Sequence, residues 1–466
     1  PSAGPVIALF AGIPLLTLIA FLAKENGVLL PLLCLVLEIG CFQARPRAIK
    51  GFFGLTLLLP LAVGAVLFVL DPARLLSGYV RRDFDWQERL LSQARALCDY
   101  LVQIAVPNPS RMGIYTDDFP ASTGLLSPPS TLLALLLLAG ITVAAWRLRP
   151  RLPFLFVGWG IFLAGHALES SIVPLELYFE HRNYLPMLGV LYALVGLASM
   201  AIARLDEKGY RAGRLGAAAA VCVLAVFAFA THGRARTWRT QQALAEASVA
   251  AHPQSMRAWL AVVSDAIDRR DYARARSALG AMTRLEQPRA RAQGYLNRVN
   301  LDCALAHAAS PSDIRNAVAA RPARVTKDES ETFDLLDRNT QVPCAGISNR
   351  ALAGAAATFA DAAATQPDSL GAKAELRHAA ARFYAREGDW PAALKQAELA
   401  WQPGMPAAAS VLLVQAQLAA GDLAGAERTW RQATRRARPG DEAGLRWLQK
   451  QIEAARDRAR EGQAPP

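Results

Sequence analysis

The hydrophobic residues of this chain form seven apolar blocks in its first half, separated by short polar or charged stretches. A helix needs about 20 apolar residues to cross a bilayer, and several blocks approach that length. The pattern predicts membrane-spanning helices over 5–23, 27–42, 51–70, 131–146, 153–168, 186–203 and 215–230. Because several of these blocks are short, we expect short or tilted helices among them.

The second half is rich in Ala and Arg, and its apolar residues recur at helical spacing. The stretches GDWPAAL from Gly388 and GDLAGAE from Gly421 are two copies of one turn and helix start, about 33 residues apart, and RDYARAR from Arg270 is a third. A period near 34 with paired helices is typical of tetratricopeptide repeats, which stack into a solenoid. Residues 308–349 fit this period poorly, and we expect loosely packed helices there.

These patterns predict an all-α protein with two domains. Residues 1–233 form a polytopic transmembrane helical domain of about seven spans, and residues 234–466 form a tetratricopeptide-like α-solenoid. Within the first domain, residues 85–106 repeat apolar positions every three or four residues. This spacing predicts an amphipathic helix that lies along the membrane surface within the long segment 71–130.

Charge predicts the orientation of the membrane helices. The net charge of +12 is carried mainly by arginine, and in the first half the basic residues lie in short loops between apolar blocks. Three such loops carry Arg45, Arg47 and Lys50; Arg147, Arg149 and Arg151; and Arg204, Lys208, Arg211 and Arg214. By the positive-inside rule these loops are cytoplasmic, so the C-terminal domain lies outside the cytoplasm. Because the basic residues lie in the loops that set membrane topology and do not form a nucleic-acid-binding motif, we expect no nucleic-acid binding.

Ionisable side chains gather between two predicted spans, in the stretch 175–186. The residues concerned are Glu176, Glu180, His181, Arg182 and Tyr184. Such a cluster at a membrane surface marks either a binding site for a phosphate-bearing or polar substrate, or an ordinary charged loop.

Two further polar pairs carry similar alternatives. Lys24 and Glu25 interrupt the apolar sequence. They either contribute to a binding site for the phosphate-bearing donor substrate or form a structural ion pair. Asp117 and Asp118 bind an acceptor or a divalent cation, or simply form a turn.

Cys303 and Cys344 are the only cysteines of the second half. If this half lies in an oxidising compartment, they form a disulfide across the irregular insert; otherwise they are two free thiols. The cysteine spacing and the six scattered histidines predict no metal site, and no cofactor is evident, although Asp117 and Asp118 leave a divalent cation possible.

Three stretches carry a resemblance to a known family: LAKENGVLLP at 22–31, DDFP at 117–120 and FEHRNYLP at 179–186. With the repeats, the chain resembles a bacterial GT-C-like membrane glycosyltransferase with C-terminal tetratricopeptide repeats. It is similar to the transmembrane-and-tetratricopeptide O-mannosyltransferase family.

The resemblance implies transfer of a sugar from a polyprenyl-phosphate carrier to a protein or glycan acceptor, with the repeats binding the acceptor or a protein partner. It implies a bacterial inner (cytoplasmic) membrane, with the C-terminal domain in the periplasm. The family's acidic catalytic residue is expected in an external loop upstream of Pro1, so we expect this chain to be the interior of a longer protein and leave the catalytic residue unassigned.

Within this picture, Arg182 is predicted to bind the donor phosphate, with His181 and Tyr184 as hydrogen-bond donors beside it. Glu176 and Glu180 are four residues apart and would share one face of a helix, where they would orient Arg182 or bind sugar hydroxyls.

Two other functions remain open. An O-antigen-type oligosaccharide ligase or polymerase would use a lipid diphosphate-linked glycan and should carry a His-rich external loop, yet residues 71–130 contain no His. A non-catalytic, membrane-anchored repeat scaffold for envelope assembly would tolerate substitution of Arg182.

Overall fold

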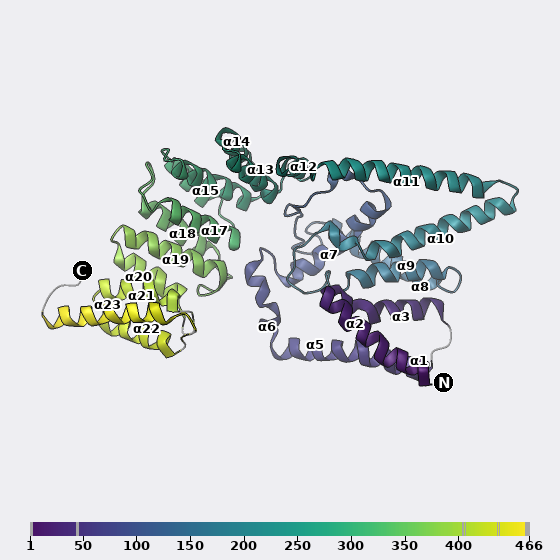
Figure 1. Cartoon of the computed structure of the whole chain (residues 1–466), viewed down its shortest axis with the longest axis horizontal. Coiled ribbons are helices and arrows are strands. Elements are labelled where there is room, and N and C mark those ends of the chain that lie inside the picture. The colour runs from purple at the N-terminus through teal and green to yellow at the C-terminus, as the bar shows by residue number, and fades with distance from the viewer. Residues whose placement is uncertain are drawn as a thin grey trace. The chain divides into compact units, whose positions relative to one another are not determined.

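The computed structural model describes residues 3–42, 46–402, 405, 407–435, 437 and 439–461, so the predicted loop residue Arg45 lies outside the described residues. Within these ranges every regular element is a helix, which confirms the all-α prediction (Figure 1). Contacts divide the chain into a first unit, Pro1–Tyr79 with Phe84–Ala258, and a second unit, Val80–Asp83 with Trp259–Pro466. The division therefore falls after the boundary expected at 233.

Four helical segments of the described chain are long and apolar enough to cross a membrane. The first, Arg47–Leu70, joins α4 (Arg47–Phe53), η3 (Gly54–Leu58) and α5 (Leu59–Leu70), and the others are α8 (Ser130–Leu148), α10 (Pro186–Glu207) and α11 (Ala212–Arg236). At most 17% of the most apolar window of each is buried inside the protein. Large apolar surfaces of this kind are costly in water and stable in lipid, which indicates a membrane protein.

The other three predicted spans are helical but shorter. They correspond to η1 (Ala8–Gly12) with α2 (Ile13–Ala23), to α3 (Leu30–Cys41) and to α9 (Pro153–His166), and α1 (Ala3–Ile7) precedes the first of them. After α2 the chain turns sharply into η2 (Glu25–Leu29). A Cβ atom at Gly27 would lie 2.2 Å from the carbonyl carbon of Ala20, so only glycine allows this close return.

Helices α9 and α10 cross at a pair of glycines. A Cβ atom on Gly158 would lie 2.5 Å from the carbonyl oxygen of Gly189, and one on Gly189 would lie 2.2 Å from that of Gly158. Small residues at such a crossing let two membrane helices approach closely. The basic α8–α9 and α10–α11 turns lie on the same side of this unit (Figure 1).

The segment between α5 and α8 is partly helical. It contains α6 (Pro72–Leu76), η4 (Ser77–Arg81), α7 (Trp86–Ala105) and η5 (Pro109–Arg111), and α7 agrees with the predicted helix. Asp85 caps α7 by accepting hydrogen bonds from the backbone N–H groups of Gln87 and Glu88, while the Glu88 side chain returns to the Asp85 N–H. This capping box fixes where the helix begins.

Helix α12 (Gln241–Ala251) belongs to the first unit, and the division between the units falls within α13 (Met256–Asp268). The remaining helices are α14 (Tyr272–Met282), α15 (Pro288–Ala304), α16 (Pro311–Ala319), α17 (Lys327–Asn339), α18 (Asn349–Ala362), α19 (Gly371–Arg386), α20 (Trp390–Ala400), α21 (Ala407–Ala419), α22 (Leu423–Arg435) and α23 (Glu442–Arg460). Helix α15 packs against α17, α17 against α19 and α19 against α21, in addition to contacts between sequence neighbours.

The three predicted copies of the turn share one backbone conformation. Arg270, Gly388 and Gly421 have φ angles of 59°, 75° and 78°. In each copy the following aspartate accepts a hydrogen bond from the backbone N–H group three residues later. A left-handed residue followed by an aspartate N-cap ends one helix and starts the next.

The insert at 308–349 is not loosely packed. Val325, Phe333 and Leu336 are fully buried in the largest apolar cluster of the second unit. A disulfide joins Cys303 to Cys344. The repeat pattern weakens here because connecting loops flank α16 and α17, and not because the segment lacks a core.

Candidate functional site

The predicted ionisable cluster lies in an irregular segment, residues 167–185, which joins α9 to α10. Its one regular element is the 3₁₀-helix η6 (Glu180–Asn183). A segment without helix or sheet must satisfy its buried backbone groups with side chains or water. The side chains that do so come largely from α7.

One polar face of α7 holds this segment. Arg89, Gln93 and Tyr100 are buried and lie four and seven residues apart, which places them on one side of the helix. The Arg89 guanidinium donates hydrogen bonds to the carbonyl oxygens of Ser171 (3.1 Å), Leu175 (2.5 Å), Glu176 (2.7 Å) and Glu169. One side chain thereby satisfies four backbone carbonyl groups of the irregular segment.

Gln93 and Tyr100 extend this set of contacts. The Gln93 amide donates to the Leu177 carbonyl at 2.8 Å. The Tyr100 hydroxyl donates to the Phe179 carbonyl at 3.0 Å and accepts from the Phe179 N–H at 2.8 Å. Burial raises the pKa of Tyr100 to about 12, so the hydroxyl keeps its proton and can make both bonds.

Arg182, the predicted phosphate ligand, is buried and paired with Glu169. Its Nε atom lies 3.2 Å from Oε2 of Glu169, and the side chains are 5% and 7% exposed. The Arg182 Nη1 atom also donates to the Glu176 carbonyl at 2.8 Å. The amide of Asn26 donates to the other oxygen of Glu169 at 2.6 Å. The structure therefore joins the stretch that contains Lys24 and Glu25 to the stretch that contains Arg182.

The other predicted residues of this cluster are more accessible. Lys24, Glu25, His181 and Tyr184 are exposed, and 82% of Tyr184 is accessible. Partial burial lowers the pKa of His181; the positive charges of Arg182 and Lys24 lower it further, against the opposing effect of Glu169. Lys24 and His181 thus lie within electrostatic reach of each other. No ion pair between Lys24 and Glu25 occurs in the described part of the chain.

One buried polar atom beside the Arg182–Glu169 pair, Oδ1 of Asn26, lacks a hydrogen-bond partner among the described residues. His166 and Asn183 lie within hydrogen-bonding reach of each other. His166 stacks on Tyr100 with ring centroids 5.2 Å apart. Unpaired buried polar atoms are uncommon because each costs about 1–3 kcal/mol, and they offer donors and acceptors to a bound polar group.

Glu176 and Glu180 do not share a helix face, contrary to the sequence prediction. Residues 174–179 are not helical, so the two side chains point to different partners. Glu176 pairs with Arg257 at 3.3 Å, and Glu180 accepts a hydrogen bond from the Gly113 N–H at 3.3 Å. Burial raises the pKa of Glu180, although Gly113, Arg234 and His252 oppose this shift.

Asp117 and Asp118 bind the segment that leads into α13. Asp117 accepts hydrogen bonds from the Ser255 hydroxyl at 2.5 Å and from the Arg257 N–H at 3.2 Å. Asp118 lies 2.9 Å from Nδ1 of His252, and this hydrogen bond raises the pKa of His252 despite partial burial. Within the described ranges no group of three His, Cys, Asp or Glu side chains is arranged to hold a metal ion.

Sequence reasoning missed the residues that organise this site: Asn26, Arg89, Tyr100, Glu169 and Asn183. Arg89 and Tyr100 could have been found, because they interrupt the apolar face of a helix that was correctly located. Asn26 and Glu169 carried no such signal, since each lies in a short polar stretch beside an apolar block and nothing in the sequence indicates that the two stretches meet.

The resulting arrangement is a buried polar cluster at the ends of apolar helices, with a lysine and a histidine at its exposed side. Comparison of this chain with protein families, with curated proteins and with solved structures finds no match.

Proposed function

We propose that this protein is a membrane glycosyltransferase that moves a sugar from a polyprenyl-phosphate-linked donor to a protein or glycan acceptor outside the cytoplasm. The observation that carries the proposal is the convergence of two distant stretches on one polar cluster. Asn26 and Glu169 are 143 residues apart and share a hydrogen bond. Glu169 in turn pairs with Arg182, so that residues from both stretches meet in the cluster.

The cations of this cluster suit a phosphate leaving group. Sugar transfer from a lipid phosphate leaves negative charge on the phosphate, and cationic or hydrogen-bonding groups held in place stabilise it. Lys24 and His181 are exposed and would contact the phosphate directly. Arg182 is buried, so its proposed role becomes that of a fixed positive charge that Glu169 keeps in position.

The exposed carboxylate of Glu25 and the hydroxyl of Tyr184 lie in the same two stretches and would bind sugar hydroxyls. Glu176 pairs with Arg257, and Glu180 accepts a hydrogen bond from Gly113, so we propose that both residues stabilise the site and do not bind substrate. Asp117 and Asp118 support it in the same way, through the segment 252–257.

The second unit is proposed to be a tetratricopeptide-like solenoid that binds the acceptor or a protein partner. Two observations support this: the packing of α15, α17, α19 and α21 in succession, and the three turns with the same backbone conformation. The disulfide between Cys303 and Cys344 supports a location in an oxidising compartment, which is the periplasm if the membrane is a bacterial inner membrane.

A second function, a membrane-anchored scaffold, is favoured by one observation. Arg182 and Arg89 are both buried, and they bond to Glu169 and to backbone carbonyls of residues 169–176. Such bonds would stabilise the segment whether or not a substrate binds there.

Transfer assays separate the two functions. Membranes that contain equal amounts of each variant are supplied with radiolabelled polyprenyl-phosphate-linked hexoses, and transfer to protein and glycan is counted. We expect Lys24→Ala and His181→Ala each to lower transfer at least about tenfold, as expected for the loss of a group that stabilises developing charge. Lys208→Ala is the matched control, because Lys208 is exposed and follows α10 on the side of the basic turns.

Two results would contradict the proposed glycosyltransferase activity. Transfer by Lys24→Ala and His181→Ala equal to that of the wild type would remove these residues from the site. Absence of transfer from every donor, together with normal assembly of envelope partners, would favour the scaffold.

A further inference from the structure

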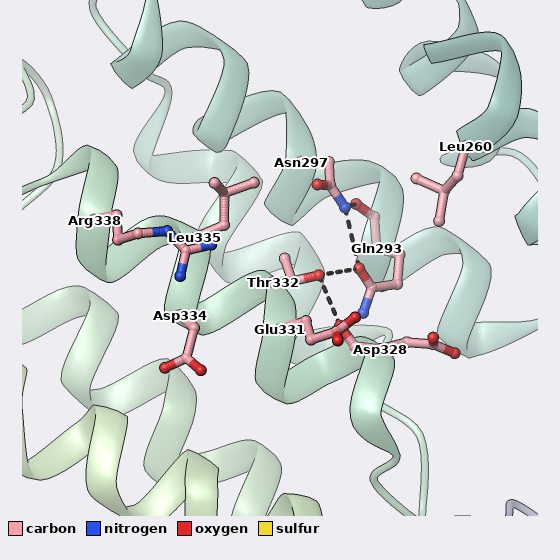
Figure 2. A pocket seen from close by; sticks show the side chains of 9 residues that line it. All are labelled: Leu260, Gln293, Asn297, Asp328, Glu331, Thr332, Asp334, Leu335 and Arg338. Atoms are coloured by element: carbon pink, nitrogen blue, oxygen red, sulfur yellow. Dashed lines mark hydrogen bonds between the residues drawn. The ribbon is translucent and has the colours of Figure 1, made fainter. Parts of the chain in front are cut away.

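A polar groove lies on the second unit, and it is formed by three helices that are not consecutive in the chain. Side chains from α13, α15 and α17 line a hollow of about 500 Å³ (Figure 2). A second hollow of about 400 Å³ is lined by α17, α19 and α21. Asp334 of α17 lines both, so the two hollows are neighbours along one face of these helices.

The wall of the first hollow contains a buried amide with an unused donor. Gln293 is 1% exposed, and its Oε1 atom accepts hydrogen bonds from Thr332 at 2.7 Å and from Asn297 at 3.1 Å (Figure 2). Its Nε2 atom has no hydrogen-bond partner within the described residues. A buried N–H group of this kind is costly unless it is paired, and a peptide carbonyl is a suitable acceptor for it.

The groove is acidic, although the whole chain carries a net charge of +12. Four carboxylates and two guanidinium groups line the two hollows: Asp328, Glu331, Asp334, Glu375, Arg338 and Arg382. Arg382 lies 2.6 Å from Asp334 and 2.7 Å from Asp337, so this guanidinium group and the Asp334 carboxylate are already paired. Glu331 is paired with Lys327 at 2.7 Å, and both of these side chains are exposed to solvent, where a second cation can compete for the carboxylate.

The histidine of the groove does not change this balance. Burial lowers the pKa of His378, and the nearby charge of Arg382 lowers it further, against the opposing effect of Asp334. His378 is therefore neutral at pH 7, and the carboxylates remain in excess.

We propose that this groove binds an extended, cationic polypeptide segment, with Lys or Arg side chains on its carboxylates and a backbone carbonyl on Gln293. This inference rests on the proposed role of the second unit in binding an acceptor or partner, and it names the chemistry of that ligand. Neighbouring helices are about 9 Å apart, so the path from α13 to α21 is roughly 35 Å, or about ten extended residues. A linear chain matches that path.

Fluorescence polarisation with the purified full chain in detergent tests the proposal. The probes are two fluorescein-labelled peptides of equal length, (Lys-Ala-Ser)₄ and (Glu-Ala-Ser)₄. We expect the cationic peptide to bind at least about tenfold more tightly than the acidic one, with an affinity that falls as salt increases. Equal binding of the two peptides, or tighter binding of the acidic one, would overturn the proposal.

Charge-neutral variants locate the binding surface. Glu331→Gln combined with Glu375→Gln removes two exposed groove carboxylates, and we expect about fivefold weaker binding of the cationic peptide. Asp268→Asn combined with Glu398→Gln is the matched control, because these exposed carboxylates do not line the groove. Wild-type affinity in the groove variant, or equal losses in the two double variants, would exclude this groove.

The same protein samples distinguish failure of this inference from failure of the proposed function. Lys24→Ala should bind the cationic peptide as the wild type does, because Lys24 belongs to the first unit. Peptide binding without any sugar transfer would support the binding groove and contradict the proposed glycosyltransferase activity. Sugar transfer without charge-selective peptide binding would support the glycosyltransferase activity and contradict the binding groove.

Discussion

The two units each contain an irregular segment, and the segments are stabilised in different ways. In the first unit, residues 167–185 are held by buried polar side chains, chiefly Arg89, Tyr100 and Arg182. In the second unit, the insert 308–349 is held by apolar burial around Phe333 and by the disulfide between Cys303 and Cys344. The first segment depends on directional bonds and the second on packing and a covalent link.

This difference follows from what surrounds each segment. Residues 167–185 have little regular structure, so many of their carbonyl groups need partners, and a buried arginine can satisfy several at once. The insert of the second unit contains α16 and α17, whose carbonyl groups are mostly used within the helices, so apolar side chains can form its core. A polar network also fixes one geometry more strictly than apolar packing does, which a binding site requires.

The largest expected effect comes from Arg89→Met. This change removes four hydrogen bonds to backbone carbonyl groups, of which only that of Glu176 keeps a second donor, Arg182, and we expect it to destabilise the first unit by about 3–5 kcal/mol. Thermal unfolding in detergent and limited proteolysis within 167–185 measure the loss. Arg239→Met is the control, because Arg239 is exposed in the same unit. Proteolysis at the wild-type rate would show that Arg89 does not hold this segment.

Removal of the disulfide tests the other segment. The bond closes a loop with a sequence separation of 41, so Cys303→Ser with Cys344→Ser should lower the free energy of unfolding of the second unit by about 3–4 kcal/mol. The change in the denaturation midpoint measures this, with the exposed Cys222→Ser as control. An unchanged midpoint would mean that apolar packing alone holds the insert.

The repeated turns allow a smaller test with opposite signs. Gly388 has a φ angle of 75°, so Gly388→Ala should cost about 1 kcal/mol of stability. Arg270 has a φ angle of 59° at the equivalent place, and Arg270→Gly should recover part of the same cost. Chemical denaturation of both variants measures the pair. Changes of the same sign would show that the two turns are not equivalent.

The smallest effect concerns the contact between His252 and Asp118. The carboxylate raises the pKa of His252, so the contact contributes its full stability below about pH 6.5 and loses it as pH rises through the raised value. NMR titration of ¹⁵N-labelled histidine should show a lower pKa for His252 in Asp118→Asn. An equal pKa in the variant and the wild type would mean that the hydrogen bond does not form in solution.

Much of the fold could be predicted from the sequence. All seven apolar blocks are helical, and the three turns that start with Arg270, Gly388 and Gly421 share a conformation, because both features depend on residues close in the chain. The shared helix face of Glu176 and Glu180 was wrong, because the bonds of residues 167–185 with α7 hold that stretch in a non-helical conformation. The function and the assignment of the solenoid remain proposals.

The sequence by itself determined that the chain is helical, where its apolar helices lie and which residues end and cap the repeated turns. These properties depend on spacing and on local backbone preferences. The tertiary structure alone decided that Asn26, Glu169 and Arg182 meet, that Arg89 of α7 holds the segment before Arg182, and that α13, α15 and α17 line one groove. Such contacts join residues far apart in the chain, and they form only where the packing of whole helices brings buried polar groups within bonding distance.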